Sequence, residues 1–147
     1  MKRASVAVAV AASLALASPV APVVHAAAAE KGKRPKLEVR VLPRFGFSPL
    51  NALAIAELKG GDDHEDLYCP EIEWEWDDGG RSITEPDCPA YEPGVTKIER
   101  RFSAEHLFKR AGNYAIKVTL RRNGDQVAQG SVRLEVKPGP GDPTIEE

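Results

Sequence analysis

Two indole rings stand on alternate residues in Trp74-Glu75-Trp76-Asp77-Asp78-Gly79, and turn-forming residues follow them directly. Alternate side chains of an extended strand point to the same face, so the two tryptophans make one face strongly apolar. The Asp-Asp-Gly-Gly run behind them favours a turn. The segment therefore predicts a β-strand that ends in a turn, with Trp74 and Trp76 as candidate core residues.

A second strand is predicted over residues 114–121. Tyr114, Ile116 and Val118 fall on one side of it, and Lys117 and Thr119 fall on the other. This alternation is typical of an antiparallel strand with one buried face and one solvated face. The three side chains on the first side are candidate core residues.

The other predicted strands are less regular. Residues 37–41 and 97–102 alternate, and residues 126–136 do so after the Asn123-Gly124 pair, which is a strong hairpin signal. Residues 52–58 are apolar and predict a further strand, although their alanines would also suit a short helix.

The segments between these strands are expected to be connections, namely residues 44–51, 79–94 and 103–111. Gly130 is expected to mark a β-bulge in the last strand. Six or seven short strands with turns between them and little helix predict an all-β, antiparallel β-sandwich.

Two motifs resemble those of the polycystic-kidney-disease (PKD) type of immunoglobulin-like domain. The strand motif of that family typically reads W-x-F-G-D-G, and residues 74–79 match it with Trp76 for Phe and Asp77 for the first Gly. A later H-x-[YF] is matched by residues 106–108, and G-x-Y-x-[VI]-x-[VL]-x-[VL] by residues 112–120. The resemblance implies an immunoglobulin-like sandwich of about seven strands. It also implies a non-catalytic extracellular module for protein or carbohydrate contact.

Four parts are predicted along the chain. Lys2 and Arg3 precede an apolar run and a small-residue stretch, which together predict a secretory signal peptide. The parts are a signal peptide at 1–29 with cleavage near 26–29, a flexible lead-in at 30–36, the PKD-like domain at 37–137 and a flexible tail at 138–147. No stable membrane anchor is expected after cleavage, and the protein is predicted to be secreted or periplasmic.

The chain is mildly acidic. The formal net charge is −2 at pH 7, and removing Lys2 and Arg3 from the 20 basic residues leaves 18 against 22 acidic ones, or −4. No basic patch with interleaved aromatic residues is evident in the sequence. Nucleic acid is therefore not an expected partner.

Two cysteines, Cys69 and Cys88, flank the tryptophan strand. Disulfides persist in exported proteins, so a bridge is expected, and closing this loop would stabilise the fold by roughly 3 kcal/mol. A zinc site built with His64 and His106 is the alternative. The absence of a Cys-x-x-Cys pair disfavours it.

Two acidic runs, at 62–66 and 77–78, carry the oxygen ligands that calcium prefers. The candidate calcium ligands are Asp62, Asp63, Asp66, Asp77 and Asp78. No Asp-x-Asp-x-Asp-Gly loop with a distal Glu is present. No cofactor or metal is therefore assigned, and a calcium-binding exported sandwich is kept as the alternative.

No catalytic residue is predicted. His64 lies in an acidic run, and His106 belongs to the family-like motif. Ser82 and Ser103 lack a G-x-S-x-G context. Paired carboxylates of a glycosidase need a defined separation across a cleft, which a sandwich of this size rarely encloses.

These expectations combine into an exported, non-catalytic PKD-like module that contacts an unidentified protein or polysaccharide at or outside the cell envelope. The tryptophan pair has a second interpretation, as a platform on which sugar rings stack. The two loops that the predicted bridge joins are the candidate contact surface, because loops on a rigid scaffold commonly carry binding. The sequence does not specify the oligomeric state.

Overall fold

The computed structural model describes residues 34–140 and 142. The predicted signal peptide and much of the predicted lead-in and tail lie outside the described residues. Eight strands form within the described part: β1 (Lys36–Leu42), β2 (Phe45–Phe47), β3 (Leu50–Lys59), β4 (Glu71–Glu75), β5 (Arg81–Thr84), β6 (Arg101–Phe108), β7 (Gly112–Arg122) and β8 (Asp125–Lys137). One turn of 3-10 helix, η1 (Glu65–Leu67), lies between β3 and β4.

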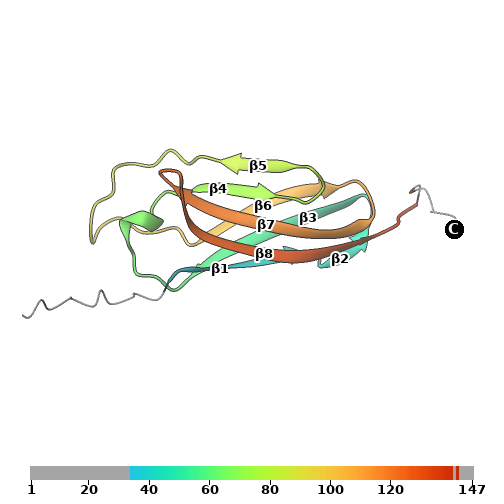
Figure 1. Ribbon diagram of the computed structural model, residues 1–147, viewed down its shortest axis with the longest axis horizontal. Helices are drawn as coiled ribbons and strands as arrows, with labels where there is room; N and C mark the ends of the chain where they lie inside the picture. Colours follow the sequence, from blue (N-terminus) through green and yellow to red (C-terminus); the bar gives the residue numbers. More distant parts are fainter. Residues whose placement is uncertain (1–33, 141, 143–147) are drawn as a thin grey trace, which may run out of the picture. The chain divides into compact units, whose positions relative to one another are not determined.

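Two stacked sheets make up the fold (Figure 1). The smaller sheet has the order β1-β3-β6, and the larger has the order β2-β8-β7-β4-β5. Neighbouring strands are antiparallel, apart from the parallel pair β2 and β8. The prediction of an all-β sandwich is confirmed, with eight described strands in place of about seven.

Inward side chains from both sheets fill the space between them. Among the largest fully buried are Trp74, Trp76, Phe108, Ile116, Leu120, Leu134, Val41 and Val118. Burying each aliphatic side chain of this kind contributes about 1.5–3 kcal/mol. Four of the five candidate core residues are buried, and Tyr114 is half-buried against the same cluster.

Aromatic rings connect the two sheets at the end of the sandwich where β4 finishes. The indoles of Trp74 and Trp76 stack with ring centroids 5.7 Å apart. From the facing sheet, the His106 ring lies 4.5 Å from Trp76. Phe108, also on β6, lies 4.6 Å from the ring of Tyr114. Residues 106–108 therefore meet the tryptophan motif across the interior, whereas the motif at 112–120 lies beside β4 in the same sheet.

The prediction that residues 44–51 form only a connection is wrong, because β2 lies within them and pairs with β8. A three-residue strand is too short to show a periodic pattern. The expected loop at 79–94 likewise contains β5, which pairs with β4 at the edge of the sheet. All four residues of β5 are exposed, so no alternation of apolar side chains marks it.

The expected connection at 103–111 is also wrong in part. β6 begins at Arg101 and pairs with β3 as far as Phe108. Its pattern is obscured because Leu107 faces solvent and His106 faces the aromatic cluster. Most of the predicted strand at 97–102 is therefore loop, and the true strand lies further along the chain.

The helical alternative for residues 52–58 does not hold. β3 is the central strand of its sheet and pairs with β1 on one side and β6 on the other. Its inward residues are mostly alanines, and Ile55 is buried on the opposite face. A strand that is covered on both faces loses the alternation that distinguishes it from a helix.

Gly130 does not form the predicted bulge. It pairs regularly with Val118, and the register shift lies instead between Leu120 and Arg121. A Cβ atom at Gly130 would lie 2.3 Å from the carbonyl oxygen of Leu37. Glycine is required here because the backbone of β1 approaches β8 closely.

Candidate functional site

The disulfide-joined loops, residues 60–70 and 85–100, lie together at one end of the sandwich (Figure 1). The first connects β3 to β4, and the second connects β5 to β6. Each loop crosses from one sheet to the other, because β3 and β6 belong to the smaller sheet and β4 and β5 to the larger.

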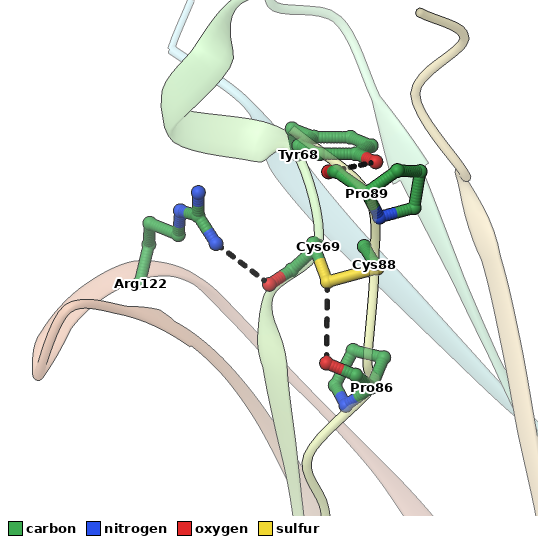
Figure 2. The surroundings of a disulfide bond; sticks show 6 residues. All are labelled: Tyr68, Cys69, Pro86, Cys88, Pro89 and Arg122. Carbon is green, nitrogen blue, oxygen red and sulfur yellow. Dashed lines mark hydrogen bonds between the residues drawn. A yellow bond between two sulfur atoms is a disulfide. The ribbon is translucent and has the colours of Figure 1, made fainter. Parts of the chain in front are cut away.

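A disulfide between Cys69 and Cys88 joins the loops, as Figure 2 shows. The alternative zinc site is thereby excluded, because both thiols are consumed. Sγ of Cys69 lies 3.3 Å from the carbonyl oxygen of Pro86, a close contact in which the bonded sulfur has no hydrogen to donate. Arg122, from the β7–β8 hairpin, donates a hydrogen bond to the carbonyl oxygen of Cys69.

Two tyrosines hold the loops together beside the bridge. The hydroxyl of Tyr68 donates to the carbonyl oxygen of Pro89 at 2.9 Å (Figure 2). The Tyr91 ring packs against Tyr68 at 5.5 Å, and its hydroxyl donates to the carbonyl oxygen of Asp63. Each loop thus contributes one ring to the contact and accepts one hydrogen bond from the other.

Arg100 adds a further link between the loops. Its guanidinium donates to the carbonyl oxygens of Gly60 and Gly61 and lies 2.8 Å from Oδ1 of Asp63. The guanidinium therefore bridges the end of the second loop to the start of the first. Covalent, aromatic and ionic contacts together hold this surface on the sandwich.

The outer surface of the disulfide-joined loops is acidic. Its exposed acidic residues are Asp62, Asp63, Glu65, Asp66, Glu85, Asp87, Glu92 and Glu99. Within the same loops the basic side chains are Lys97 and Arg100. Since the formal net charge of the whole chain is only −2, negative charge is concentrated on this surface.

The candidate calcium ligands do not come together. Within residues 34–140 and 142, no group of three or more His, Cys, Asp or Glu side chains is arranged to hold a metal ion. In the loop, Asp63 pairs with Arg100, and Oδ2 of Asp66 lies 3.2 Å from Nδ1 of His64. Asp77 and Asp78 follow β4, at the opposite end of that strand from the disulfide-joined loops.

Asp77 and Asp78 are engaged in the turn after β4. Asp77 adopts φ of +64°, a left-handed conformation that aspartate tolerates, and its Oδ2 accepts a hydrogen bond from the backbone N–H of Ala115. Asp78 accepts one from Gly80 and lies 2.7 Å from Nε2 of His106. Burial raises the pKa of Asp78, but the bonds from His106 and Gly80 outweigh it and leave the pKa below its ordinary value.

The tryptophan pair offers no sugar-stacking platform. Trp74 and Trp76 are 2% and 0% exposed, so neither indole face can meet a ligand. Nε1 of Trp76 donates to Oγ of Ser82 on β5. Both indole rings are therefore part of the hydrophobic core.

Three of the four side chains considered as catalytic candidates make contacts within the protein. Oγ of Ser82 accepts the indole N–H of Trp76, and His106 pairs with Asp78 while stacking on Trp76. His64 contacts Asp66 on the surface.

Glu73 is a buried charge that the sequence pattern does not reveal. It lies on the outer face of β4, which the alternation assigns to solvent, yet it is only 4% exposed. Arg81 and Arg121 cover it, with guanidinium nitrogens 2.7 and 3.1 Å from its carboxylate. Burial raises the pKa of Glu73, but these two arginines outweigh it and hold the pKa below its ordinary value.

The sequence pattern also does not predict that the rings of Phe45 and Phe47 on β2 are exposed. Their i, i+2 spacing between Pro43 and Pro49 is the only signal that marks them.

No helix among the described residues is both long and apolar enough to span a bilayer. A solved structure similar to this chain is the PKD domain of an M14-like peptidase from a Thermoplasmatales archaeon. The match covers 74% of this chain and 99% of that chain, with a TM-score of 0.51 and 13% sequence identity. No protein-family model matches the sequence, and no curated protein matches it. The chain therefore has the fold of a PKD domain, as its two motifs predict.

Proposed function

We propose that this PKD-like sandwich is an exported, non-catalytic interaction module that binds a partner through its disulfide-joined loops. The observation that carries the proposal is the acidic, cross-linked surface that these loops form at one end of the sandwich. Loops held on a rigid scaffold lose little conformational entropy on binding, which favours their use as a contact surface.

The charge of the loops indicates the chemistry of the partner. Eight exposed carboxylates with two basic residues among them favour a protein with a positively charged surface. Opposite charges steer the encounter and weaken with salt. The partner is thus a basic protein of the cell envelope or its surroundings.

Export is part of the proposal. The predicted signal peptide and the Cys69–Cys88 bridge both suit an oxidising compartment outside the cytoplasm. The proposal places the protein in the periplasm or outside the cell.

Capture of partners from a cell-envelope extract by the purified protein tests the proposed surface. Reversing two loop charges, with Asp62→Lys and Glu92→Lys together, is expected to reduce retention of the partner about tenfold, or about 1.4 kcal/mol. The matched control is Glu38→Lys with Glu105→Lys, which reverses two exposed charges on the smaller sheet.

The control is expected to retain the partner, and rising salt is expected to weaken binding by the unchanged protein. If the loop variant kept full retention while its melting temperature matched that of the control, the disulfide-joined loops would not be the contact surface.

A further inference from the structure

Two phenylalanine rings stand in solvent on β2, at the opposite end of β3 from the disulfide-joined loops (Figure 1). Phe45 is 63% exposed and Phe47 is 60% exposed, whereas most large apolar side chains of this sandwich are buried. Exposing two aromatic rings side by side is unfavourable unless something covers them. The pair is therefore a candidate binding surface.

Both rings lie on the outer face of the larger sheet. In the parallel register, Phe45 is beside Glu135 and Phe47 is beside Lys137, while Gly46 is beside the buried Val136. Alternate residues of a strand face opposite sides, so the two rings share the face that Glu135 and Lys137 present to solvent. Their spacing along the strand is about 7 Å.

A depression of about 400 Å³ is lined in part by Arg44, the residue before Phe45, and neither phenylalanine ring belongs to its lining. Arg44, Asn113, Arg133 and Glu135 contribute polar groups to its lining, and Tyr114, Ala115 and Leu134 complete it. Arg44 precedes Phe45 directly, and Glu135 pairs with Phe45 across the strands, so the depression lies next to the Phe45 end of the ring pair.

The two arginines of the depression have no acidic partner in the part of the chain that the structure describes. Ion pairs within 4.0 Å there involve other cations, and Lys137 pairs with Glu135 at 3.9 Å. A guanidinium without a carboxylate is suited to bind one from a ligand, because its fork matches both oxygens. Arg44 and Arg133 therefore select an anionic ligand.

An alternative ligand for this surface is a peptide that pairs as an added strand with the free edge of β2. The carbonyl of Arg44 accepts from Glu135, and the N–H of Ser48 donates to Lys137, so the ladder to β8 uses residues 44, 46 and 48. Only Phe45 and Phe47 then direct backbone groups to the free edge. Pro43 and Pro49 flank them, so an added strand would gain few hydrogen bonds and would not reach the depression.

We propose that the Phe45–Phe47 pair and the adjoining arginine-lined depression bind an acidic polysaccharide. The apolar C–H faces of its sugar rings stack on the phenyl rings. Its carboxylates pair with Arg44 and Arg133, and its hydroxyls bond to Asn113 and Glu135. This site is independent of the disulfide-joined loops, so either proposal can fail without the other.

Calorimetric titration of the purified protein with polygalacturonate, alginate and hyaluronate tests the site. We expect binding to at least one of the three, and none to neutral dextran. Phe45→Ala with Phe47→Ala is expected to lower the affinity about tenfold or more, and so is Arg44→Gln with Arg133→Gln.

Control variants separate the site from general effects. Val95→Ala, an exposed apolar residue of the second loop, and Arg101→Gln, an exposed cation on β6, are expected to bind as the unchanged protein does. Phe45→Tyr with Phe47→Tyr keeps both rings and is expected to retain binding even if the alanine variant fails to fold.

Three results would overturn the proposal. They are an absence of heat with all three acidic polysaccharides, equal binding of polyglutamate, and loss of affinity in the Tyr variant with its fold intact. Equal binding of polyglutamate would assign the surface to acidic peptides.

Discussion

Buried aromatic residues hold the two sheets of this sandwich together at the scale of single residues. Trp74 is 2% exposed and stacks on Trp76, which in turn stacks on His106 of the facing sheet. Removing one indole leaves a cavity that the surrounding strands cannot fill. The stability of the sandwich therefore depends strongly on this strand.

Trp74→Ala is expected to destabilise the domain by about 3–5 kcal/mol. Denaturant unfolding followed by circular dichroism measures the loss. Val95→Ala, which truncates an apolar side chain that is 71% exposed, serves as the control and is expected to change stability by less than about 0.5 kcal/mol. Equal stabilities of the two variants would contradict the central place of Trp74 in the core.

Glu73 is expected to make stability depend on pH. Its folded-state pKa lies below the ordinary value, so its contribution is fully present above about pH 4.3 and is lost as the pH falls through the folded-state pKa. Glu73→Gln removes this contribution and is expected to destabilise the protein by about 1–2 kcal/mol at pH 7.

Chemical denaturation at several pH values measures the difference between Glu73→Gln and the unchanged protein. The difference is expected to shrink as the pH falls below 4. Glu105→Gln, which removes an exposed carboxylate on the outer face of β6, is the control. A difference that stays constant down to low pH would show that the charge of Glu73 does not stabilise the fold.

At the scale of elements, the β4–β5 pair depends on its flanking loops. β5 has four residues and is exposed along its whole length, so its pairing with β4 buries little apolar surface. The Cys69–Cys88 bridge joins the segment before β4 to the segment after β5. The bridge therefore closes the open end of the β4–β5 hairpin.

Cys69→Ser with Cys88→Ser is expected to lower the free energy of unfolding by roughly 3 kcal/mol on the chain-entropy model. The reduced protein is expected to lose a similar amount, because the covalent bond and not the sulfur atoms supplies the stabilisation. Thermal unfolding with and without reductant measures both. An unchanged melting temperature on reduction would contradict this account of the loops.

At the scale of the whole molecule, the two proposed surfaces lie at opposite ends of the sandwich (Figure 1). The disulfide-joined loops are acidic, and the surface beside β2 combines aromatic rings with two arginines that pair with no carboxylate among the described residues. The two proposals together place a basic protein at one end and an acidic polymer at the other. Neither contact obstructs the other.

The proposal of export makes a prediction about the mass of the mature protein. Intact-mass measurement of the protein from the cell envelope or medium is expected to show a chain that begins near residues 27–30, after removal of the leader. The mass is also expected to be two hydrogens lighter than that of the reduced chain, since Cys69 and Cys88 are bonded. A chain that retains residues 1–26 in the cytoplasmic fraction would contradict the proposal of export.

Calcium is expected to leave thermal stability unchanged. Asp63, Asp77 and Asp78 already bond to groups within the protein, and the two acidic runs lie at opposite ends of β4. Melting curves with millimolar calcium and with chelator test this expectation. A rise of several degrees with calcium would instead support the calcium-binding alternative.

The local pattern was sufficient to predict the sandwich and the strands that carry strong alternation. Trp74, Ile116 and Val118 occupy inward positions because a strand with one apolar face buries that face wherever it lies in the sheet. The motifs at 74–79 and 112–120 were sufficient to predict the PKD-like fold, since they set a strand, its turn and the neighbouring strand of the same sheet in order. These properties depend on neighbours along the chain.

Contacts between distant segments decided the rest. β2 exists because β8 supplies its partner groups, Gly130 is required because β1 passes close to it, and Glu73 is buried because two arginines from adjacent strands cover it. The polar depression beside Phe45 likewise forms only when β2, β7 and β8 lie together. Strand alternation indicates which face a side chain takes, whereas the groups that cover that face come from residues far away in the sequence. The sequence therefore predicted the loop surface, and only the tertiary structure determined the surface beside β2.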